Sequence, residues 1–224
     1  MKNLENITIC IVDCKNYDNA AKSIIYCSKF CNINFYKSIY FSDIKHDKLD
    51  NHNINFIKIE KIICSRQYDN FMIKNLKNFI ETDYVLIVQH DGIIYKPEKW
   101  TDEFLNYDYI GAPWSAAPKG INRIGNGGFS LRSKKFINRS SEILGNDYCD
   151  ENEDIFLSCT IYNQMKKEKF NYCNIELASK FSYEHPHEFS SPDTFGFHLA
   201  ACGQANETHK IFRNKVYENL HKNW

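Results

Sequence analysis

Apolar residues recur along the first part of the chain in short runs that polar stretches separate. Runs at residues 7–12, 38–41, 56–59 and 84–88 are rich in β-branched and aromatic side chains, and each has the length of a buried strand. The pattern therefore predicts a series of strands in this part of the chain.

Helical periodicity fills two of the intervals between these runs. After the first strand, one face of a helix is formed by Ala20, Ala21, Ile24 and Ile25. Ser65 is expected to cap a second helix, whose apolar face consists of Phe71, Met72, Leu76, Phe79 and Ile80. Strands that alternate with helices predict βαβ units, and hence an α/β fold whose mixed sheet is mostly parallel and flanked by helices.

Beyond residue 91 the expected elements become shorter. A short helix or turn is expected at residues 97–105. Three short strands are expected after it, at residues 109–112, 128–132 and 178–181. Pro113 should stop the first of these strands, because proline cannot donate a hydrogen bond to a neighbouring strand.

Two more helices are expected in this part of the chain. Ser133 should cap a short helix that runs through Ile137. An amphipathic helix should follow the acidic cluster at residues 150–154, because acidic side chains suit a helix N-terminus.

No internal repeat, linker or low-complexity segment divides the 224 residues. The simplest organisation is a single domain covering residues 1–224, with a nucleotide-binding half at about 1–92 and an acceptor or catalytic half at about 93–205. Hydrophobic residues make up 43% of the chain and aromatic residues 15%, which is typical of a globular protein.

Charge and hydropathy narrow the classes of partner. The 28 basic and 28 acidic residues cancel, which disfavours nucleic acid as the main partner. No apolar run is long enough to span a bilayer, and the N-terminus lacks the pattern of a signal peptide, so a cytoplasmic protein is expected. The oligomeric state cannot be read from the sequence.

The nine cysteines show neither the spacing of a disulfide framework nor the CxxC pairs of a structural zinc site. Cys27 and Cys31 could share a helix face, and Cys10 and Cys14 bracket the end of a strand. We expect most of the cysteines to be small buried apolar residues.

Asp91 is the first candidate for chemistry. The apolar run at residues 84–88 leads directly into Gln89, His90, Asp91 and Gly92, which puts the carboxylate at the C-terminal edge of the sheet. Open α/β sheets bind their ligands at that edge. A carboxylate there suits Mg²⁺ or Mn²⁺ bridging to substrate phosphates, although such a residue can also be a turn former.

The segment at residues 125–128 is rich in glycine and leads into a strand. It is neither a Walker loop nor a dinucleotide fingerprint. Two interpretations remain open: a tight hairpin turn, or a wall against which a sugar ring lies, with Asn126 and the backbone of Gly127 and Gly128 bonding its hydroxyls.

Glu153 and Asp154 are the best candidates for a general base, because an ionised carboxylate can remove a proton from a hydroxyl. Helix capping is an equally good interpretation of the pair. His198 lies among aromatic residues, where a histidine is more often structural than functional. The stretch at residues 183–188 contains two histidines but has the spacing of a surface loop.

These motifs together resemble one protein family. The similarity lies in seven separated segments that occur in the family's order, at residues 89–92, 100–105, 107–114, 125–133, 153–154, 181–184 and 195–198. In these residues the chain is similar to DUF5672, a family of bacterial and viral glycosyltransferase-like proteins with a GT-A-like, Rossmann-like fold. The resemblance extends from about Ser65 to His198.

The resemblance implies transfer of a sugar from a nucleotide donor, with a UDP-sugar favoured, to a hydroxyl of a glycan or glycoconjugate, as in polysaccharide biosynthesis. It implies donor contacts from loops at several strand ends, namely Val12, Asp13, Ser65, Arg66, Gln89, His90 and Asp91. Asp91 resembles the last residue of a metal-binding DxD motif and His198 a late metal ligand, so Mn²⁺ or Mg²⁺ is the implied cofactor. Gln89 stands where the first Asp of that motif would be.

The same resemblance implies roles for the second half of the chain. Asp154 resembles the catalytic base of inverting enzymes, with Glu153 holding the acceptor, and Trp114 is expected to stack on a sugar face. Two alternatives remain. One is a nucleotide-sugar or glycan-binding protein without turnover, and the other is a metal-dependent nucleotidyltransferase or phosphohydrolase.

Overall fold

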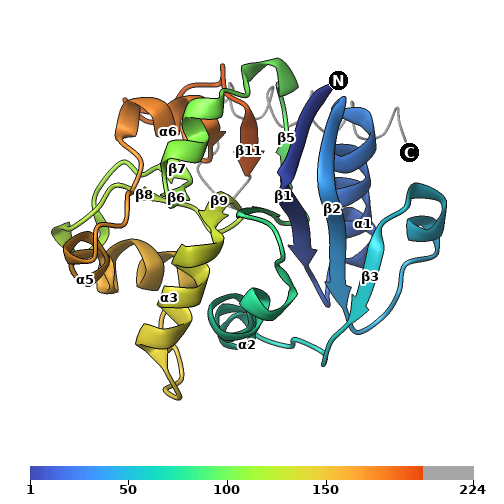
Figure 1. The fold of residues 1–224 in the computed structure, drawn as a ribbon, viewed down its shortest axis with the longest axis horizontal. Helices are drawn as coiled ribbons and strands as arrows, with labels where there is room; N and C mark the ends of the chain where they lie inside the picture. Colours follow the sequence, from blue (N-terminus) through green and yellow to red (C-terminus); the bar gives the residue numbers. More distant parts are fainter. Residues whose placement is uncertain (199–224) are drawn as a thin grey trace.

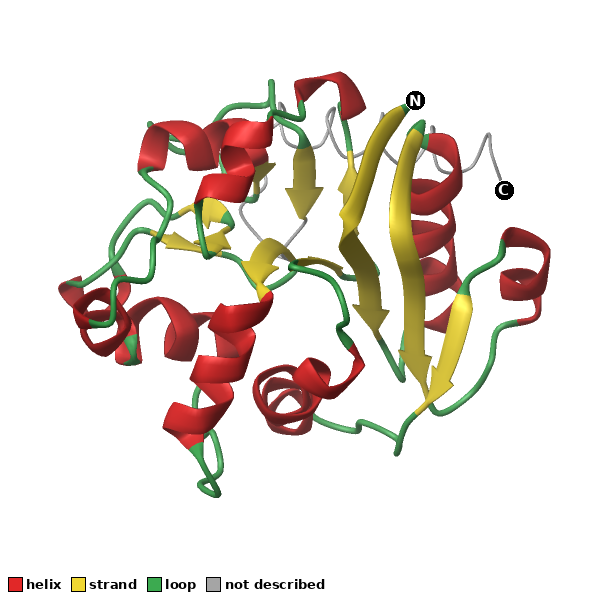
Figure 2. Cartoon of the chain, viewed as in Figure 1, coloured by secondary structure: helices red, strands yellow, loops and turns green. Residues whose placement is uncertain are grey.

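A six-stranded sheet crosses the centre of the computed structural model, which describes residues 1–198 (Figures 1 and 2). Its strand order is β3-β2-β1-β4-β9-β6. The first four strands in this order run parallel, and β9 is antiparallel to both of its neighbours. The strands are β1 (Lys2–Val12), β2 (Ile33–Ser42), β3 (Asn55–Lys58), β4 (Tyr84–Val88), β6 (Tyr109–Ile110) and β9 (Phe129–Ser133). The predicted α/β fold with a mostly parallel sheet is confirmed.

Two small sheets lie beside the second half of the main sheet. One has the order β10-β11-β5, from Ser182–Tyr183, Gly196–His198 and Gly92–Ile94. The other pairs β7 (Ala112–Pro113) with β8 (Ile124–Gly125). The first matters for the site, because His198 at the end of β11 pairs with Gly92 at the start of β5, directly after Asp91.

Helices cover the sheet and connect its strands (Figure 1). The α-helices are α1 (Tyr17–Ile25), α2 (Ser65–Asn70), α3 (Lys134–Leu144), α4 (Glu153–Ile155), α5 (Tyr162–Lys167) and α6 (Ile175–Phe181). π-helical turns continue three of them, at Tyr26–Phe30, Phe71–Asn75 and Phe156–Thr160. Single 3₁₀ turns lie at Asp47–His52, Leu76–Phe79, Pro97–Lys99, Asp102–Asn106 and Pro118–Gly120.

The parallel strands are apolar on both faces because helices cover both. On β1, Ile9 and Ile11 belong to the core cluster that also contains Ile24 of α1. The alternate residues Cys10 and Val12 pack in a second cluster under the helical segment at 65–80. This double burial explains why the strands read as continuous apolar runs.

Several predicted boundaries need correction. The strand predicted at 178–181 is wrong: these residues end helix α6, which Asn174 caps by accepting a hydrogen bond from the N–H of Leu177 at 2.8 Å. Ser65 does not cap the second helix, since Cys64 occupies the cap position. The strand predicted at 109–112 is split at Gly111 between two sheets, and its second part, β7, ends at Pro113 as predicted.

Other predictions hold. Ser133 caps α3 as predicted, accepting a hydrogen bond from the N–H of Phe136 at 3.2 Å, although the helix extends beyond Ile137 to Leu144. Of the cysteines in residues 1–198, all but Cys64 are buried, as expected of small apolar residues. Cys202 lies outside the described residues.

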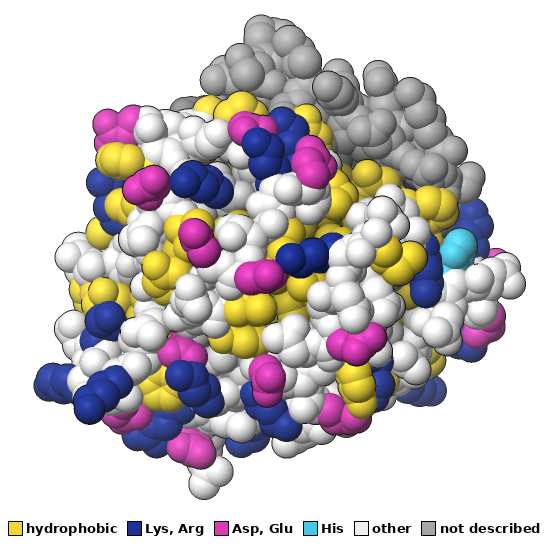
Figure 3. All heavy atoms as spheres, turned by 45° about the horizontal axis from the view of Figure 1, so that its top comes forward, with side chains coloured by type: hydrophobic (Ala, Val, Ile, Leu, Met, Phe, Trp, Pro, Cys, Tyr) yellow, Lys and Arg dark blue, Asp and Glu magenta, His cyan; other side chains and the backbone are white. Residues whose placement is uncertain are grey.

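The surface carries no dominant charge on the face that Figure 3 presents. Basic and acidic side chains are interspersed there, with apolar atoms between them. This mixture matches the zero formal net charge of the chain.

Candidate active site

The carboxyl ends of β1 and β4 lie side by side, because the two strands pair in parallel. β1 leads into Asp13, and β4 leads into Gln89, His90 and Asp91. His90 Nδ1 lies 3.3 Å from Asp13 Oδ2, so the loops that follow the two strands are in contact.

Asp13 shapes the loop after β1. Its Oδ1 accepts hydrogen bonds from the backbone N–H groups of Lys15 at 2.7 Å and Asn16 at 2.6 Å. Burial raises the pKa of Asp13, but the hydrogen bonds from His90, Asn16 and Lys15 outweigh burial and leave the pKa below its ordinary value. The carboxylate is therefore ionised at neutral pH, with much of its bonding capacity used inside the loop.

A cavity of about 330 Å³ opens between these loops and the start of α2, and we call it the outer cavity. Its wall combines apolar and polar groups from three chain segments. It is lined by Val12, Asp13, Cys14, Lys15, Asn16, Ile62, Ile63, Cys64, Ser65, Tyr68, Gln89 and His90.

A second cavity of about 230 Å³ adjoins the outer one, and we call it the inner cavity. Ser65, Tyr68 and Gln89 line both. The remaining wall of the inner cavity is mostly carboxylates, amides and glycine backbone, from Asp69, Asn126, Gly127, Gly128, Asn152, Glu153, Asp154, Glu184 and His198. The two cavities thus form one bipartite site at the carboxyl edge of the sheet.

His198 lies between two carboxylates. Its Nε2 is 3.3 Å from Asp91 Oδ1, and its Nδ1 is 3.5 Å from Glu184 Oε1. Burial lowers the pKa of His198, but the two carboxylates outweigh burial and raise it to about 10. Burial raises the pKa of Asp91, and the neighbouring His198 and His90 outweigh that and hold it below its ordinary value.

Glu153 is held by a buried arginine. Arg132 Nη2 donates to Glu153 Oε1 at 2.8 Å and to Oε2 at 3.0 Å, and both side chains are buried. Burial raises the pKa of Glu153 to about 7, although the charge of Arg132 opposes this. The capping interpretation is wrong for Glu153, because its side chain turns inward and its own N–H donates to Asp69 Oδ1 at 3.0 Å.

Asp154, unlike Glu153, is not held by an arginine of the described part of the chain. Its Oδ1 accepts a hydrogen bond from the N–H of Ile155 at 2.8 Å, and no arginine or lysine among residues 1–198 forms an ion pair with it. Burial and the neighbouring Glu184 raise its pKa. A carboxylate with a raised pKa that faces a cavity is suited to accept a proton.

The glycine segment makes room for these side chains. A Cβ on Gly127 would lie 2.0 Å from Glu153 Oε1, and a Cβ on Gly128 would lie 2.1 Å from His198 Nε2. Asn126 adopts a φ of 72° and accepts hydrogen bonds at Oδ1 from the N–H groups of Gly128 at 3.0 Å and Phe129 at 3.3 Å. The segment is therefore a tight turn and also one wall of the inner cavity.

Three residues predicted for the site do not line either cavity. Arg66 is directed to Asp69, with its Nη1 3.5 Å from Asp69 Oδ2. Trp114 packs against Gly125, where a Cβ would lie 1.7 Å from the indole ring. Asp91 lies behind His198, which lines the inner cavity in its place.

The structure adds four residues that the sequence did not single out. Tyr68 and Asp69 come from α2, Glu184 follows β10, and Arg132 lies within β9. The sequence signal for Arg132 was slight, since it is the last residue of the strand predicted at 128–132, and a charged residue buried in a strand needs a partner. Glu184 was assigned to a surface loop, but it is 8% exposed.

Donors of the kind that bind a divalent cation converge beside His198. Gln89 Oε1 lies 3.1 Å from His198 Nε2, and Gln89 Nε2 donates to the Tyr68 hydroxyl at 2.9 Å, which turns the amide oxygen toward the histidine. Asp91 Oδ1 is buried and faces His198 Nε2 at 3.3 Å. Within residues 1–198 no cluster of three His, Cys, Asp or Glu suits a metal. Gln89, Asp91 and His198 nevertheless bring two oxygen donors and one imidazole together, which are donor types that divalent cations accept.

None of the helices in residues 1–198 is both long enough and apolar enough to cross a bilayer.

Comparison with known proteins identifies relatives of the sequence and of the fold. The model of a family described as a protein of unknown function, DUF5672, matches residues 51–198. No curated protein sequence matches the chain.

Solved glycosyltransferases share the fold at low sequence identity. The galactosyltransferase LgtC, solved with donor and acceptor sugar analogues, is 14% identical with a TM-score of 0.50, covering 95% of this chain and 94% of LgtC. A glycosyltransferase involved in glycosylation of the major capsid of PBCV-1 is 15% identical with a TM-score of 0.51, and the match covers 96% of this chain and 98% of that protein. GlyE of Streptococcus pneumoniae TIGR4 is 11% identical with a TM-score of 0.51, and this whole chain spans 63% of it.

Proposed function

Since this chain belongs to the DUF5672 family and has the fold of GT-A glycosyltransferases, we propose that it transfers a sugar from a nucleotide-sugar donor to a hydroxyl of a glycan or glycoconjugate. The observation that carries the proposal is the bipartite site, in which Ser65, Tyr68 and Gln89 line both cavities. A nucleotide in the outer cavity would direct its sugar into the inner one, among the carboxylates.

The outer cavity has the composition that a nucleoside diphosphate requires. Val12, Ile62 and Ile63 supply apolar surface for a base, while Asp13 and Asn16 supply polar groups for a ribose. UDP is the favoured donor nucleotide in this proposal.

Gln89, Asp91 and His198 are the residues that would hold a divalent cation, which would displace the proton from His198 Nε2, with donor phosphates completing its shell. When bound, the cation would supply electrostatic stabilisation of the leaving diphosphate. The protein itself contributes a fixed arrangement of donors, because Tyr68 orients Gln89 and Glu184 lies against the second nitrogen of His198.

Asp154 is the proposed catalytic base. It faces the inner cavity, and its raised pKa lies closer to neutral pH than the pKa of an ordinary Asp. A general base is most effective when its pKa is near the working pH. Glu153 would border the acceptor, fixed in place by Arg132. Attack by the activated hydroxyl on the face opposite the diphosphate would invert the anomeric carbon.

A thermal-shift panel of UDP-, GDP-, CMP- and dTDP-sugars, with and without Mn²⁺, tests donor binding. A ligand that binds only the folded state raises the melting temperature by mass action. We expect the UDP-sugars to raise Tm, Mn²⁺ to enlarge the shift, and Asp91→Ala to remove the Mn²⁺ effect while the surface variant Asp83→Ala keeps it. No shift with any nucleotide would refute the proposal.

Nucleotide release from the same donors tests turnover. Asp154→Asn should reduce the rate about 10²- to 10⁴-fold, because the base is lost while the shape of the site is kept. Its donor-induced Tm shift should remain. Asp150→Asn, an exposed change in the same acidic cluster, is the matched control. Unchanged release by Asp154→Asn would remove the proposed base, and no release from any donor by wild type would indicate a binding protein.

A further inference from the structure

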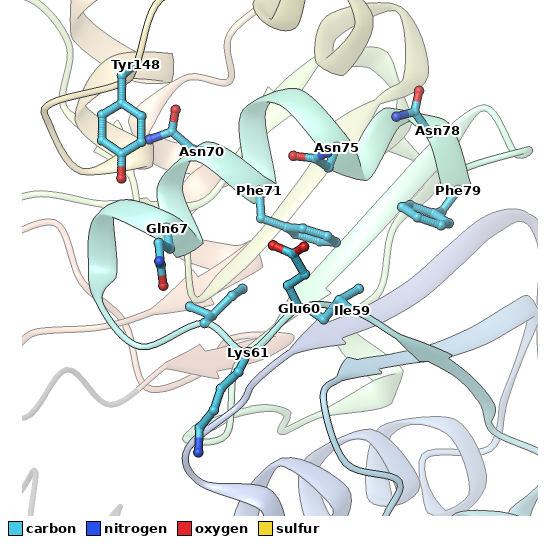
Figure 4. A pocket seen from close by; sticks show the side chains of 11 residues that line it. Ile59, Glu60, Lys61, Gln67, Asn70, Phe71, Asn75, Asn78, Phe79 and Tyr148 are labelled. Atoms are coloured by element: carbon cyan, nitrogen blue, oxygen red, sulfur yellow. The ribbon is translucent and has the colours of Figure 1, made fainter.

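A third cavity, of about 400 Å³, lies outside the bipartite site (Figure 4). It is enclosed by the extended segment 59–62 on one side and by α2 with the turns that follow it on the other. Ile62 lines both this cavity and the outer cavity, so the segment 59–62 separates the two. Nothing in the proposed transfer reaction uses this third cavity.

The floor of the third cavity is aromatic and aliphatic. The rings of Phe71 and Phe79 stack at 6.4 Å between centroids with an angle of 21° between their planes, and both side chains are only partly buried. Figure 4 shows both rings on the side of the helix that faces Ile59 and Glu60. Partly exposed rings of this kind offer apolar faces to a ligand.

Amide side chains surround this floor. Asn75 and Asn78 are exposed and line the cavity, so their side-chain amides are accessible to a ligand. Gln67 Oε1 accepts from the N–H of Ile63 at 2.8 Å, which leaves its amide nitrogen for a ligand. Amides both donate and accept, so they complement hydroxyl groups, which do the same.

Charge argues against an anionic ligand. The ionic side chains of the lining are Glu60 and Lys61, whose charges cancel. Glu60 lines the cavity together with Phe71, and Figure 4 shows Lys61 extending away from the helix that carries Phe71. A phosphate would meet the carboxylate without a facing cation, whereas a sugar hydroxyl could donate to it.

We propose that the third cavity is a second carbohydrate site, which binds a neutral oligosaccharide. A sugar ring has apolar faces that suit Phe71 and Phe79 and a rim of hydroxyls that suits the amides. Tyr148, which is 53% exposed at the edge of the cavity, supplies a further ring for a neighbouring sugar unit. The site is independent of the donor and of turnover in the bipartite site.

Titration of ¹⁵N-labelled protein with maltohexaose, cellohexaose, mannohexaose and chitohexaose, each to about 10 mM, tests this site by NMR. At least one probe should shift the side-chain amide signals of Asn75 and Asn78. Asn75→Ala and Tyr148→Ala should each weaken that binding about 3- to 10-fold, the effect of one lost polar or stacking contact. Both positions are exposed, so the variants should fold.

Asn163→Ala is the matched control, an exposed asparagine on α5 outside the cavity. It should leave oligosaccharide binding unchanged, and all three variants should keep the Tm shift with UDP. Binding of no probe, or binding that survives both cavity variants unchanged, would overturn the second site. Loss of the UDP shift in wild type would instead count against the proposed transferase.

Discussion

Arg132 is the buried cation around which the carboxylates of the inner cavity are arranged. It is the last residue but one of β9 and is fully buried, with its guanidinium carbon 5.6 Å from the centre of the Tyr109 ring. Its Nη2 donates to both oxygens of Glu153, and Nη1 has no hydrogen-bond partner in residues 1–198. A buried ion pair of this kind costs much more when it is broken than when it is replaced as a unit.

Replacing Arg132 by Met should therefore reduce the free energy of unfolding by about 3–5 kcal/mol, because Glu153 would be left buried without a counter-charge. Urea denaturation measures the change. Arg139→Met is the matched control, since Arg139 is partly exposed and its ion pairs are at the surface, where each contributes about 0–1 kcal/mol. The double variant Arg132→Met with Glu153→Leu should recover part of the loss. If it is no more stable than the single variant, the ion pair is not the cause.

The pKa of Glu153 also predicts how stability depends on pH. Burial raises this pKa from an ordinary 4.5 to about 7, so between these values the folded protein binds more protons than the unfolded chain. The free energy of unfolding should therefore fall as pH rises through this window, by at most about 1.4 kcal/mol per pH unit from this group.

Urea denaturation of wild type and Glu153→Gln from pH 4.5 to pH 7 tests this dependence. The variant should show a flatter decline, because Gln does not titrate, whereas the surface change Glu103→Gln should keep the slope of wild type. Asp154, whose pKa burial also raises, adds to the slope in the same direction. Identical slopes in wild type and Glu153→Gln would contradict the raised pKa.

Helix α3 begins at a cap that the sequence predicts, and the structure shows a second use of the same hydroxyl. Ser133 Oγ accepts from the N–H of Phe136 at 3.2 Å and donates to Asp108 Oδ1 at 2.7 Å. Asp108 Oδ2 accepts in turn from the N–H of Asn171 at 2.9 Å. The cap thus links the helix to the strand β6 and to the loop before α6.

Ser133→Ala should lower the free energy of unfolding by about 1–2 kcal/mol, the upper range for a lost cap, because a buried carboxylate loses a donor as well. Ser179→Ala, a partly exposed serine in α6, should change it by about 0.5 kcal/mol or less. The difference in urea midpoint between the two variants is the measurement. Equal effects would mean that the link to Asp108 contributes nothing.

The helical segment at 65–80 shows what periodicity predicts and what it does not. Met72 and Leu76 are buried against the sheet, as their spacing predicts. The segment is nevertheless divided into an α-helix, a π-helical turn and a 3₁₀ turn. Apolar spacing determines which face packs on the sheet, whereas the local hydrogen-bond pattern adjusts to the packing.

The main sheet joins the two halves of the chain. β9 and β6 from the second half extend the sheet of β1 to β4, and β5 pairs with β11 across a long stretch of sequence. A strand pair that is buried on both faces cannot separate without exposing the apolar side chains of the adjoining strands to water. Residues 1–198 are therefore built around one continuous main sheet, and the single domain over residues 1–224 stays a prediction.

Unfolding should accordingly be one cooperative transition. Far-UV circular dichroism, which reports the whole chain, and tryptophan fluorescence, to which Trp100 and Trp114 contribute, should follow the same urea curve with the same midpoint. Two separated transitions would contradict the single domain and would place a boundary between the halves. Added UDP should move both curves together to higher urea.

Local sequence patterns were enough to predict the parallel strands, the faces of the helices, the cap at Ser133 and the position of Asp91 just after β4. These features depend on the spacing of apolar and polar residues within a few positions, which is a local property. The fold was needed to show that 178–181 is helical, that Glu184 is buried, and that Gly127 and Gly128 make room for Glu153 and His198.

The bipartite site is also a feature that local sequence patterns could not predict. Tyr68, Gln89 and His198 meet although long stretches of sequence separate them. Their burial, pKa values and hydrogen bonds depend on neighbours that the fold supplies, and no local pattern encodes those neighbours. For this reason the sequence could indicate the kind of chemistry, while the chain had to fold before its residues formed a site.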